Sequence, residues 1–197
     1  MTLYQNKYRV ETTRLRGWDY SKPGAYFVTI VTKNRECLFG NIVVNEMILN
    51  DAGNIVQQWY LDIPNHFPNV KLDAFIIMPN HVHGIIFITE NHAQPITTTV
   101  PVIVETQNFA SLPPSTNARN EKQPYTNQFG PQSKNLASIV RGFKIGVTKW
   151  FRQNNNHNPL WQSRFHDHII RNDESLQRIR NYIVNNPKSW QKDTFHN

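Results

Sequence analysis

The residues in this sequence best suited to chemistry are two histidines separated by one residue. His81 and His83 lie in a run of apolar, β-branched residues that follows Pro79-Asn80. On a strand, alternation would point both imidazoles to one face, with their roots about 6–7 Å apart, so both could bind one divalent cation. The spacing alone is a weak signal, because His166 and His168 show it too. A bare pair is equally consistent with polar residues at a strand end.

The second candidate is Tyr182, in a helix predicted from Asn172–Asp173 to about Asn186. It lies on the shoulder of an apolar stripe, and Asn186, four residues later, shares its face. A phenol has a pKa of about 10 and is a weak nucleophile until a base or a cation assists it. Periodicity alone would also allow Tyr182 to be a packing residue.

The pattern of elements predicts the scaffold that must position these residues. Two helices are expected between the strands, and the helix that carries Tyr182 follows the last strand. The order β-α-β-β-α-β predicts an α+β, ferredoxin-like (split βαβ) antiparallel sheet with helices on one face, plus the extra C-terminal helix. The expected strands are Ala25–Lys33, Asn69–Met78, His81–Thr89 and Arg164–Ile170, and the two helices are Asn45–Tyr60 and Leu136–Arg152.

Length and composition predict one domain over residues 1–197 with a flexible insertion at 91–133, which is rich in Pro, Thr, Asn and Gln. No apolar run is long enough to span a membrane, and the N-terminus has no apolar core typical of a secretory signal. The single Cys37 cannot form an internal disulfide. We therefore expect a cytoplasmic protein without a membrane partner, associated with the nucleoid of a prokaryotic cell.

The charge distribution predicts a polyanionic partner. The net charge is +7, and residues 134–197 hold eleven Lys and Arg against four Asp and Glu, whereas the rest of the chain is balanced. We expect phosphate contacts and base stacking from this basic part and from the N-terminal residues, with a solvated basic face, a solvated tail and ordinary core packing as the alternatives. The residues expected to bind DNA are Arg14, Arg16, Trp18, Tyr20, Arg141, Lys144, Lys149 and Arg152.

Several segments together resemble a known family. MPNHVHGIIFI resembles the histidine strand of HUH endonucleases, and LASIVRGFKIGVTKWF with WQSRFHDHIIRNDESLQRIRNYIVNNP resembles the second half of single-tyrosine HUH transposases. The opening RLRGWDYSKPGAYFVTIVT is similar to the branch of REP-associated tyrosine transposases. The resemblance covers about residues 14–90 and 134–190. The insertion at 91–133 is longer than is usual in this family.

The resemblance implies a site and a reaction. His81 and His83 would be metal ligands, Asn186 the third ligand, and Tyr182 the nucleophile that forms a 5′-phosphotyrosine on single-stranded DNA. The family implies Mg²⁺ or Mn²⁺, although two imidazoles would also suit Zn²⁺. It also implies a hairpin or palindromic repeat as substrate, and a transposase-like endonuclease and strand transferase acting as a monomer or a homodimer.

Two other functions fit parts of the same pattern. One is another HUH enzyme, a replication initiator or relaxase, although no helicase or second tyrosine domain is present. The other is a non-catalytic ferredoxin-like module that binds RNA or DNA. Such a module usually presents paired aromatic residues in its central strands, whereas this predicted strand begins with two histidines.

Overall fold

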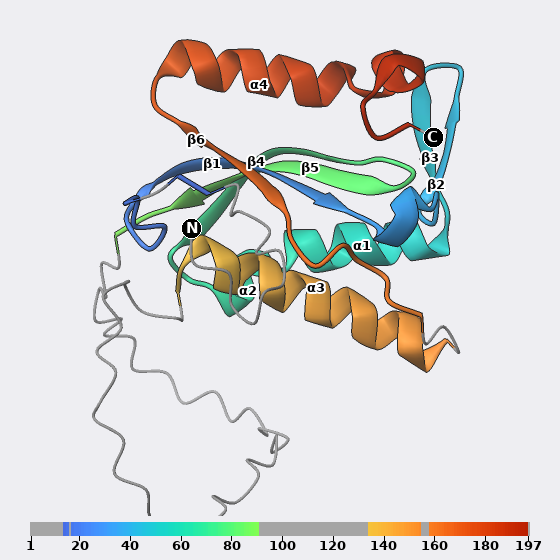
Figure 1. The fold of residues 1–197 in the computed structure, drawn as a ribbon, viewed down its shortest axis with the longest axis horizontal. Helices are drawn as coiled ribbons and strands as arrows, with labels where there is room; N and C mark the ends of the chain where they lie inside the picture. Colours follow the sequence, from blue (N-terminus) through green and yellow to red (C-terminus); the bar gives the residue numbers. More distant parts are fainter. Residues whose placement is uncertain (1–13, 16, 91–133, 155–157, 197) are drawn as a thin grey trace, which may run out of the picture. The chain divides into compact units, whose positions relative to one another are not determined.

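The structure, a computed structural model, describes residues 14–15, 17–90, 134–154 and 158–196 (Figure 1). These residues belong to one compact unit. The predicted insertion at 91–133 and the expected DNA contact Arg16 lie outside the described residues.

The core of the fold is a four-stranded antiparallel sheet with the order β4-β5-β1-β6. Runs rich in apolar residues form β1, β4 and β5, whereas β6 begins with polar residues, and β4 and β5 are joined by the tight turn at Pro79-Asn80. This strand order and the helical crossovers make the fold ferredoxin-like, as predicted. The strands are β1 (Gly24–Val31), β4 (Val70–Ile77), β5 (His81–Ile88) and β6 (His166–Ile170).

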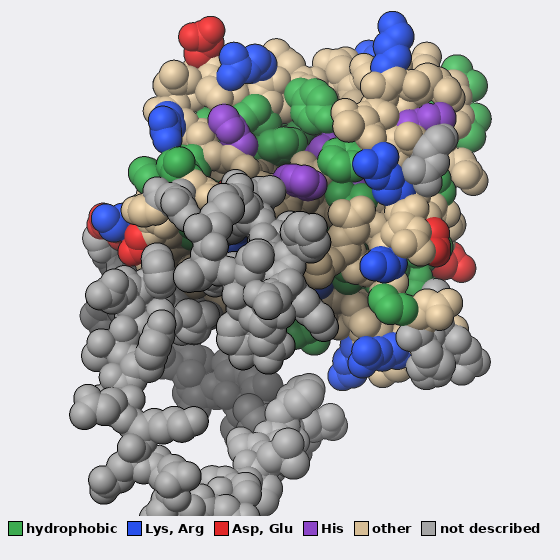
Figure 2. Space-filling view, viewed as in Figure 1, with side chains coloured by type: hydrophobic (Ala, Val, Ile, Leu, Met, Phe, Trp, Pro, Cys, Tyr) green, Lys and Arg blue, Asp and Glu red, His purple; other side chains and the backbone are tan. Residues whose placement is uncertain are grey.

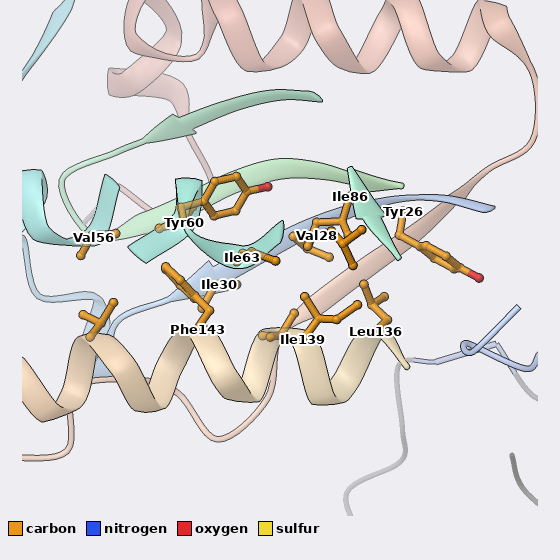
Figure 3. Close-up of a cluster of buried hydrophobic side chains, with 14 of the residues drawn as sticks. Tyr26, Val28, Ile30, Val56, Tyr60, Ile63, Ile86, Leu136, Ile139 and Phe143 are labelled. Carbon is orange, nitrogen blue, oxygen red and sulfur yellow. The ribbon is translucent and has the colours of Figure 1, made fainter. Parts of the chain in front are cut away.

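One face of the sheet packs against α1 (Asp51–Leu61), α2 (Ile63–His66) and α3 (Leu136–Gln153). The apolar stripe of α3 is buried there against alternate residues of the strands, and Figure 3 shows this cluster between the sheet and the helix. The side chains that form the centre of the cluster include Val28, Ile30, Ile86, Ile139 and Phe143.

The other face of the sheet is covered by α4 (Asp173–Asn185), which lies across the sheet from α3 in Figure 1. The Asn172 side chain caps the helix by accepting a hydrogen bond from the Ser175 amide at 2.8 Å. Ile183 is buried against Ile85 of β5, in an apolar cluster that is separate from the one beside α3. The helices expected on one face are there, and the additional helix occupies the opposite one.

The predicted helix Asn45–Tyr60 is wrong at its start. Residues 40–49 form a hairpin, β2 (Gly40–Val43) and β3 (Glu46–Leu49), and the helix begins only at Asp51. The two-residue turn has positive φ at Val44 and Asn45, as strand twist requires. Asn50 then caps α1 by accepting from the Gly53 amide at 2.9 Å, which separates strand from helix.

The last helix was predicted to run to about Asn186, and α4 does end there, directly before Pro187. The chain then continues as a 3-10 helix, η3 (Pro187–Lys192), since proline is well suited to the first turn of a new helix. A short 3-10 turn, η2 (Lys33–Arg35), also follows β1. Within the described part of the chain, none of the helices has the length and hydropathy that crossing a bilayer requires.

Candidate metal centre and tyrosine site

The pairing of β1 with β5 brings the two histidines to the face of the sheet that α4 covers. His83 pairs with Thr29 in the register, and His81 pairs with Val31. Both imidazoles are almost fully buried, and their ring centroids lie 4.4 Å apart. Nδ1 of His83 lies 2.8 Å from the Thr29 hydroxyl, so its Nε2 is turned away from the strand. The predicted alternation on this strand is therefore confirmed.

A neighbouring asparagine fixes the tautomer of His81. Asn80 donates through Nδ2 to the carbonyls of Arg35 and Phe195, at 3.0 and 2.8 Å, so its Oδ1 is the atom that faces Nδ1 of His81 at 2.8 Å. An amide oxygen only accepts, so Nδ1 of His81 carries the proton and Nε2 keeps a lone pair. Such a contact to the far nitrogen is typical of histidines that bind metal.

Two buried acceptors at this site lack a hydrogen-bond partner among the described residues: Nε2 of His81 and Oδ1 of Asn186. Asn186 is 1% exposed, and its Nδ2 donates to Asp193 at 3.2 Å, which leaves the oxygen unpartnered. Buried polar atoms without partners are costly, and two lone-pair acceptors cannot satisfy each other. A cation would satisfy both, so these residues fit a metal ion.

Asp193 is a further candidate ligand that the sequence analysis missed. One ligand atom each from His81, His83 and Asp193 lie within 4.8 Å of one another, in the only such group of His, Cys, Asp and Glu found in the described part of the chain. The carboxylate reaches the histidines because η3 turns the chain back after Pro187. No spacing or periodicity in the sequence marks this residue.

Residues 193–196 also cover the site with an aromatic side chain. The ring of Phe195 lies 4.9 Å from that of His81, between centroids, and the Arg35 guanidinium donates to the Thr194 carbonyl at 3.1 Å. Together with the bond from Asn80 to the Phe195 carbonyl, these contacts hold the segment over the two histidines.

Tyr182 reaches the same site from α4. Its hydroxyl lies 3.2 Å from Nε2 of His83, and its ring meets that of Phe27 edge-on at 6.0 Å. The side chain is 44% exposed, so a ligand in solvent has access to the phenol. The sequence-based prediction that Tyr182 and Asn186 share a face agrees with this placement.

Burial keeps both imidazoles neutral. It lowers the pKa of His81 to about 3 and the pKa of His83 well below its usual value, with the neighbouring His81 adding to the second effect. Burial also raises the pKa of the Tyr182 phenol, and the negative charge of Asp193 raises it further, whereas the neighbouring Asn186 side chain opposes both effects. Without a cation the site thus holds neutral histidines and a neutral phenol.

An ion pair anchors α4 close to the tyrosine. Arg180 donates to both carboxylate oxygens of Asp73, at 2.7 and 2.6 Å, and holds the pKa of that carboxyl below its usual value. Asp73 lies where the β4–β5 register shifts, between Leu72 and Phe75. A bidentate contact of this kind restrains the rotation of α4 about its axis, and with it the direction in which the Tyr182 side chain points.

The glycine that follows His83 is required by packing from the opposite face. A Cβ on Gly84 would collide with the hydroxyl of Tyr60 from α1. This hydroxyl is fully buried and makes no hydrogen bond to a described residue. Only glycine therefore lets α1 approach β5 this closely.

The expected DNA contacts fall into different environments. Tyr20 is buried and accepts a hydrogen bond from the Leu15 amide at 3.0 Å, which argues against a stacking role, and Trp18 is partly exposed with its Nε1 bonded to the Tyr26 hydroxyl. Lys144 donates to the carbonyls of Gln162 and Arg164, which argues against a phosphate contact. The others, Arg14, Arg141, Lys149 and Arg152, border a surface groove together with Lys144.

The second histidine pair lies beside the first. His166 pairs with Thr29 and His168 with Phe27, so both side chains lie on the same face of the sheet as His83, but they are exposed. Figure 2 shows histidine side chains gathered on the surface below α4. The pair therefore borders the site rather than forming a second one.

Comparison with known proteins gives relatives of similar length. A protein of Haemophilus influenzae without an assigned function is 41% identical over 183 residues, which cover 93% of this chain and 91% of that protein. A candidate REP-associated tyrosine transposase of the same organism is 26% identical over 187 residues, covering 90% of this chain and 83% of that one. No family model matches the chain.

The fold has a counterpart among solved structures. A REP-associated tyrosine transposase bound to a REP hairpin superposes with a TM-score of 0.51 at 17% identity, covering 90% of this chain and 74% of the other. At this identity the likeness shows the fold. The histidine strand, the tyrosine helix and these relatives support the REP-associated tyrosine transposase family for this chain, and with it a transposase-like function.

Proposed function

We propose that the protein is a metal-dependent endonuclease and strand transferase for single-stranded DNA, with Tyr182 as its nucleophile. The observation that carries the proposal is the 3.2 Å distance from the Tyr182 hydroxyl to Nε2 of His83, beside two buried acceptors that lack a hydrogen-bond partner among the described residues. A packing tyrosine would not need to lie against a pair of neutral imidazoles. We also propose that residues 1–197 form one catalytic domain with an insertion at 91–133.

The residues that would hold the metal are His81, His83 and Asn186, as the resemblance implies, with Asp193 in addition. Two imidazoles, an amide oxygen and a carboxylate form a mixed nitrogen and oxygen set, which suits Mg²⁺ or Mn²⁺ in this family and would also accept Zn²⁺. A divalent cation bound there would supply Lewis-acid polarisation of a phosphate oxygen. The carboxylate of Asp193 would offset part of the charge of this cation.

The residues of the chain would carry out the bond changes. The oxygen of Tyr182 attacks the phosphorus, the bond to the 3′-oxygen breaks, and a 5′-phosphotyrosine and a free 3′-hydroxyl result. The phenol proton leaves to water at the exposed side of the ring, and the departing 3′-oxygen takes a proton from water. In the reverse reaction another 3′-hydroxyl attacks the phosphotyrosine and restores the phenol, so strands are rejoined without ATP.

We propose a DNA hairpin with a single-stranded flank as the substrate. A solved member of the family was bound to a REP hairpin, and residues 134–197 of this chain carry the whole excess of positive charge. The similarity to a candidate REP-associated tyrosine transposase favours this function over that of a replication initiator or relaxase. A non-catalytic binding module would share the charge but would have no use for Tyr182 beside His83.

The test is the formation of a covalent adduct. The protein is incubated with hairpin oligonucleotides that carry randomised single-stranded flanks, with Mn²⁺ or with EDTA, and separated under denaturing conditions. We expect a metal-dependent adduct that mass spectrometry maps to Tyr182. Tyr182→Phe should abolish it while hairpin binding changes by less than about twofold, and Val184→Ala, at an exposed position of the same helix, should keep it. An adduct in the Phe variant, or none in the unmodified protein, would overturn the proposal.

A further inference from the structure

A broad groove lies on the side of the sheet opposite to Tyr182. It runs along α3 beside residues 163–165 and has a volume of about 920 Å³. α3 packs on the sheet face of Val28 and Ile86, whereas Tyr182 lies on the face of His83 and Ile85. The groove is therefore separate from the tyrosine site and needs a role of its own.

The groove combines positive charge with an apolar surface. Among the described residues that line it, none is Asp or Glu, and apolar side chains such as Ile145, which is 62% exposed, and Phe165 lie between the cations. Phosphates would be attracted by the charge, and nucleobases would stack on the apolar part. The cationic residues of the lining are Arg14, Arg141, Lys144, Lys149, Arg152 and Arg164.

The walls of the groove are held in place by internal contacts. Lys144 donates to the carbonyls of Gln162 and Arg164, at 2.8 and 2.9 Å, and so ties the segment before β6 to α3. The guanidinium of Arg14 lies over the ring of Phe165, at 5.0 Å from its centroid. A groove shaped in this way exists before a ligand arrives, which reduces the entropic cost of binding.

Edge strand β6 separates the groove from the tyrosine site, and polar residues line the way around it. A second hollow of about 480 Å³ lies along β6, and its lining mixes the cationic residues Arg171 and Arg178 with the acidic residues Asp167 and Glu174, and with His168. His168 pairs with Phe27, whose ring contacts that of Tyr182. On the face that Figure 2 shows, Lys and Arg side chains are more frequent than Asp and Glu.

We propose that the groove on α3 binds the single-stranded DNA that flanks the cleaved phosphate, and that this strand passes around β6 between the groove and Tyr182. The partner is a single strand rather than a duplex, because the groove offers apolar surface for unstacked bases as well as charge for phosphates. The route to Tyr182 rests on the proposed function, whereas the binding of the strand in the groove does not.

The experiment measures binding without cleavage. Fluorescent hairpins with a flank of two or of twelve nucleotides are titrated with the full chain in EDTA and followed by anisotropy at several salt concentrations. For the long flank, the double variant Arg141→Glu/Arg152→Glu should bind about tenfold more weakly, and the slope of log Kd against log salt should fall by about two. For the short flank, the Kd of this double variant and the Kd of the unmodified protein should agree within about twofold. Ile145→Asp should also weaken binding of the long flank.

The matched control is Lys33→Glu/Lys71→Glu, which makes the same charge change at exposed positions away from the groove. It should bind both hairpins like the unmodified protein, and circular dichroism should show that all variants are folded. Equal binding of the long flank by the groove variant, equal losses for both flanks, or the same loss in the control would overturn the proposal. If a blunt duplex of equal length competes as well as the single strand, the partner is wrong. If no adduct forms at Tyr182 but the flank effect persists, the proposed function fails and the groove stands.

Discussion

The hydroxyl of Tyr182 and Nε2 of His83 lie 3.2 Å apart, so the phenol and a candidate metal ligand share one hydrogen bond. Because Nε2 can serve either the phenol or a cation, binding of a metal to His83 would release the Tyr182 hydroxyl. The arrangement would keep the phenol protonated until the site is loaded, since burial and Asp193 raise its pKa.

This relationship predicts how metal affinity responds to substitution. Tyr182→Phe should bind Mn²⁺ at least as tightly as the unmodified protein, because no hydrogen bond has to be broken. Asp193→Asn should weaken binding by about 10- to 100-fold, as loss of a supporting polar group commonly does at metal sites. Calorimetric titration with Mn²⁺ measures both, and Lys188→Ala on η3 serves as the control for changes near the segment. Unchanged affinity in the Asp193 variant would exclude that carboxylate as a ligand.

The two buried histidines predict acid instability of the protein in EDTA. Their pKa values in the folded state lie below the value of about 6.5 in the unfolded chain. Below pH 6.5 the unfolded chain therefore takes up protons that the folded protein does not, and stability falls as the pH falls. Between pH 6.5 and 5 the loss should be about 1.6 kcal/mol for His81, and His83 should add to it in the same direction.

Urea unfolding at pH 8, 6.5 and 5 measures this effect. His81→Gln/His83→Gln should lose much less stability over the same interval. Asp73 does not contribute here, because Arg180 holds its pKa below 3.8. A loss of the same size in the double variant would assign the acid sensitivity to other groups.

Packing between Gly84 and Tyr60 makes a prediction about stability alone. Gly84→Ala should destabilise the protein by about 1–3 kcal/mol, because the added methyl collides with the Tyr60 hydroxyl. Tyr60→Phe should be neutral or stabilising by about 1 kcal/mol, since it removes a buried hydroxyl that has no hydrogen-bond partner in the described part of the chain. Thermal unfolding of the double variant should show partial recovery, because the ring carbon next to that oxygen would remain too close. Strictly additive effects would contradict the direct contact.

The ion pair of Arg180 with Asp73 predicts a positioning effect on the tyrosine. Asp73→Asn should slow adduct formation about tenfold, while affinity for Mn²⁺ stays unchanged, since the pair touches α4 but no candidate ligand. The cost in stability should be about 1 kcal/mol, because both side chains are partly exposed. The exchange Asp73→Arg/Arg180→Asp should restore part of the rate. A variant with normal rate and reduced stability would leave the pair with a structural role only.

Hydrophobic periodicity made much of this fold predictable. The four strands of the sheet, α3 and α4 each carry a regular apolar pattern, and the spacing of His81 with His83 and of Tyr182 with Asn186 placed each pair on one face. The hairpin of residues 40–49 was missed because Met47 and Ile48 fit a helical pattern as well. Val44 lies in the turn of this hairpin with φ 49° and is 88% exposed. Because β-branched residues rarely adopt this conformation, a valine in the sequence gives no sign of a turn.

Long-range contacts account for the residues that the sequence did not reveal. Asp193 lies in a polar stretch after Pro187 and becomes a candidate ligand only because η3 turns it toward His81. The sequence could not show that Lys144 is turned onto two carbonyl groups, since its place on the shoulder of the apolar stripe also allows a solvated side chain. In both cases tertiary contacts, rather than local pattern, decide what the side chain does.

The side-chain amide of Asn80 makes metal binding at the site depend on the order in which the chain folds. Its contact with the Phe195 carbonyl spans 115 residues, and the same amide determines which nitrogen of His81 is protonated. During synthesis the histidine strand emerges long before residue 195, so metal capture would come late, after the sheet has formed. Mn²⁺ added at the start of refolding should then be taken up only as fast as the final segment docks.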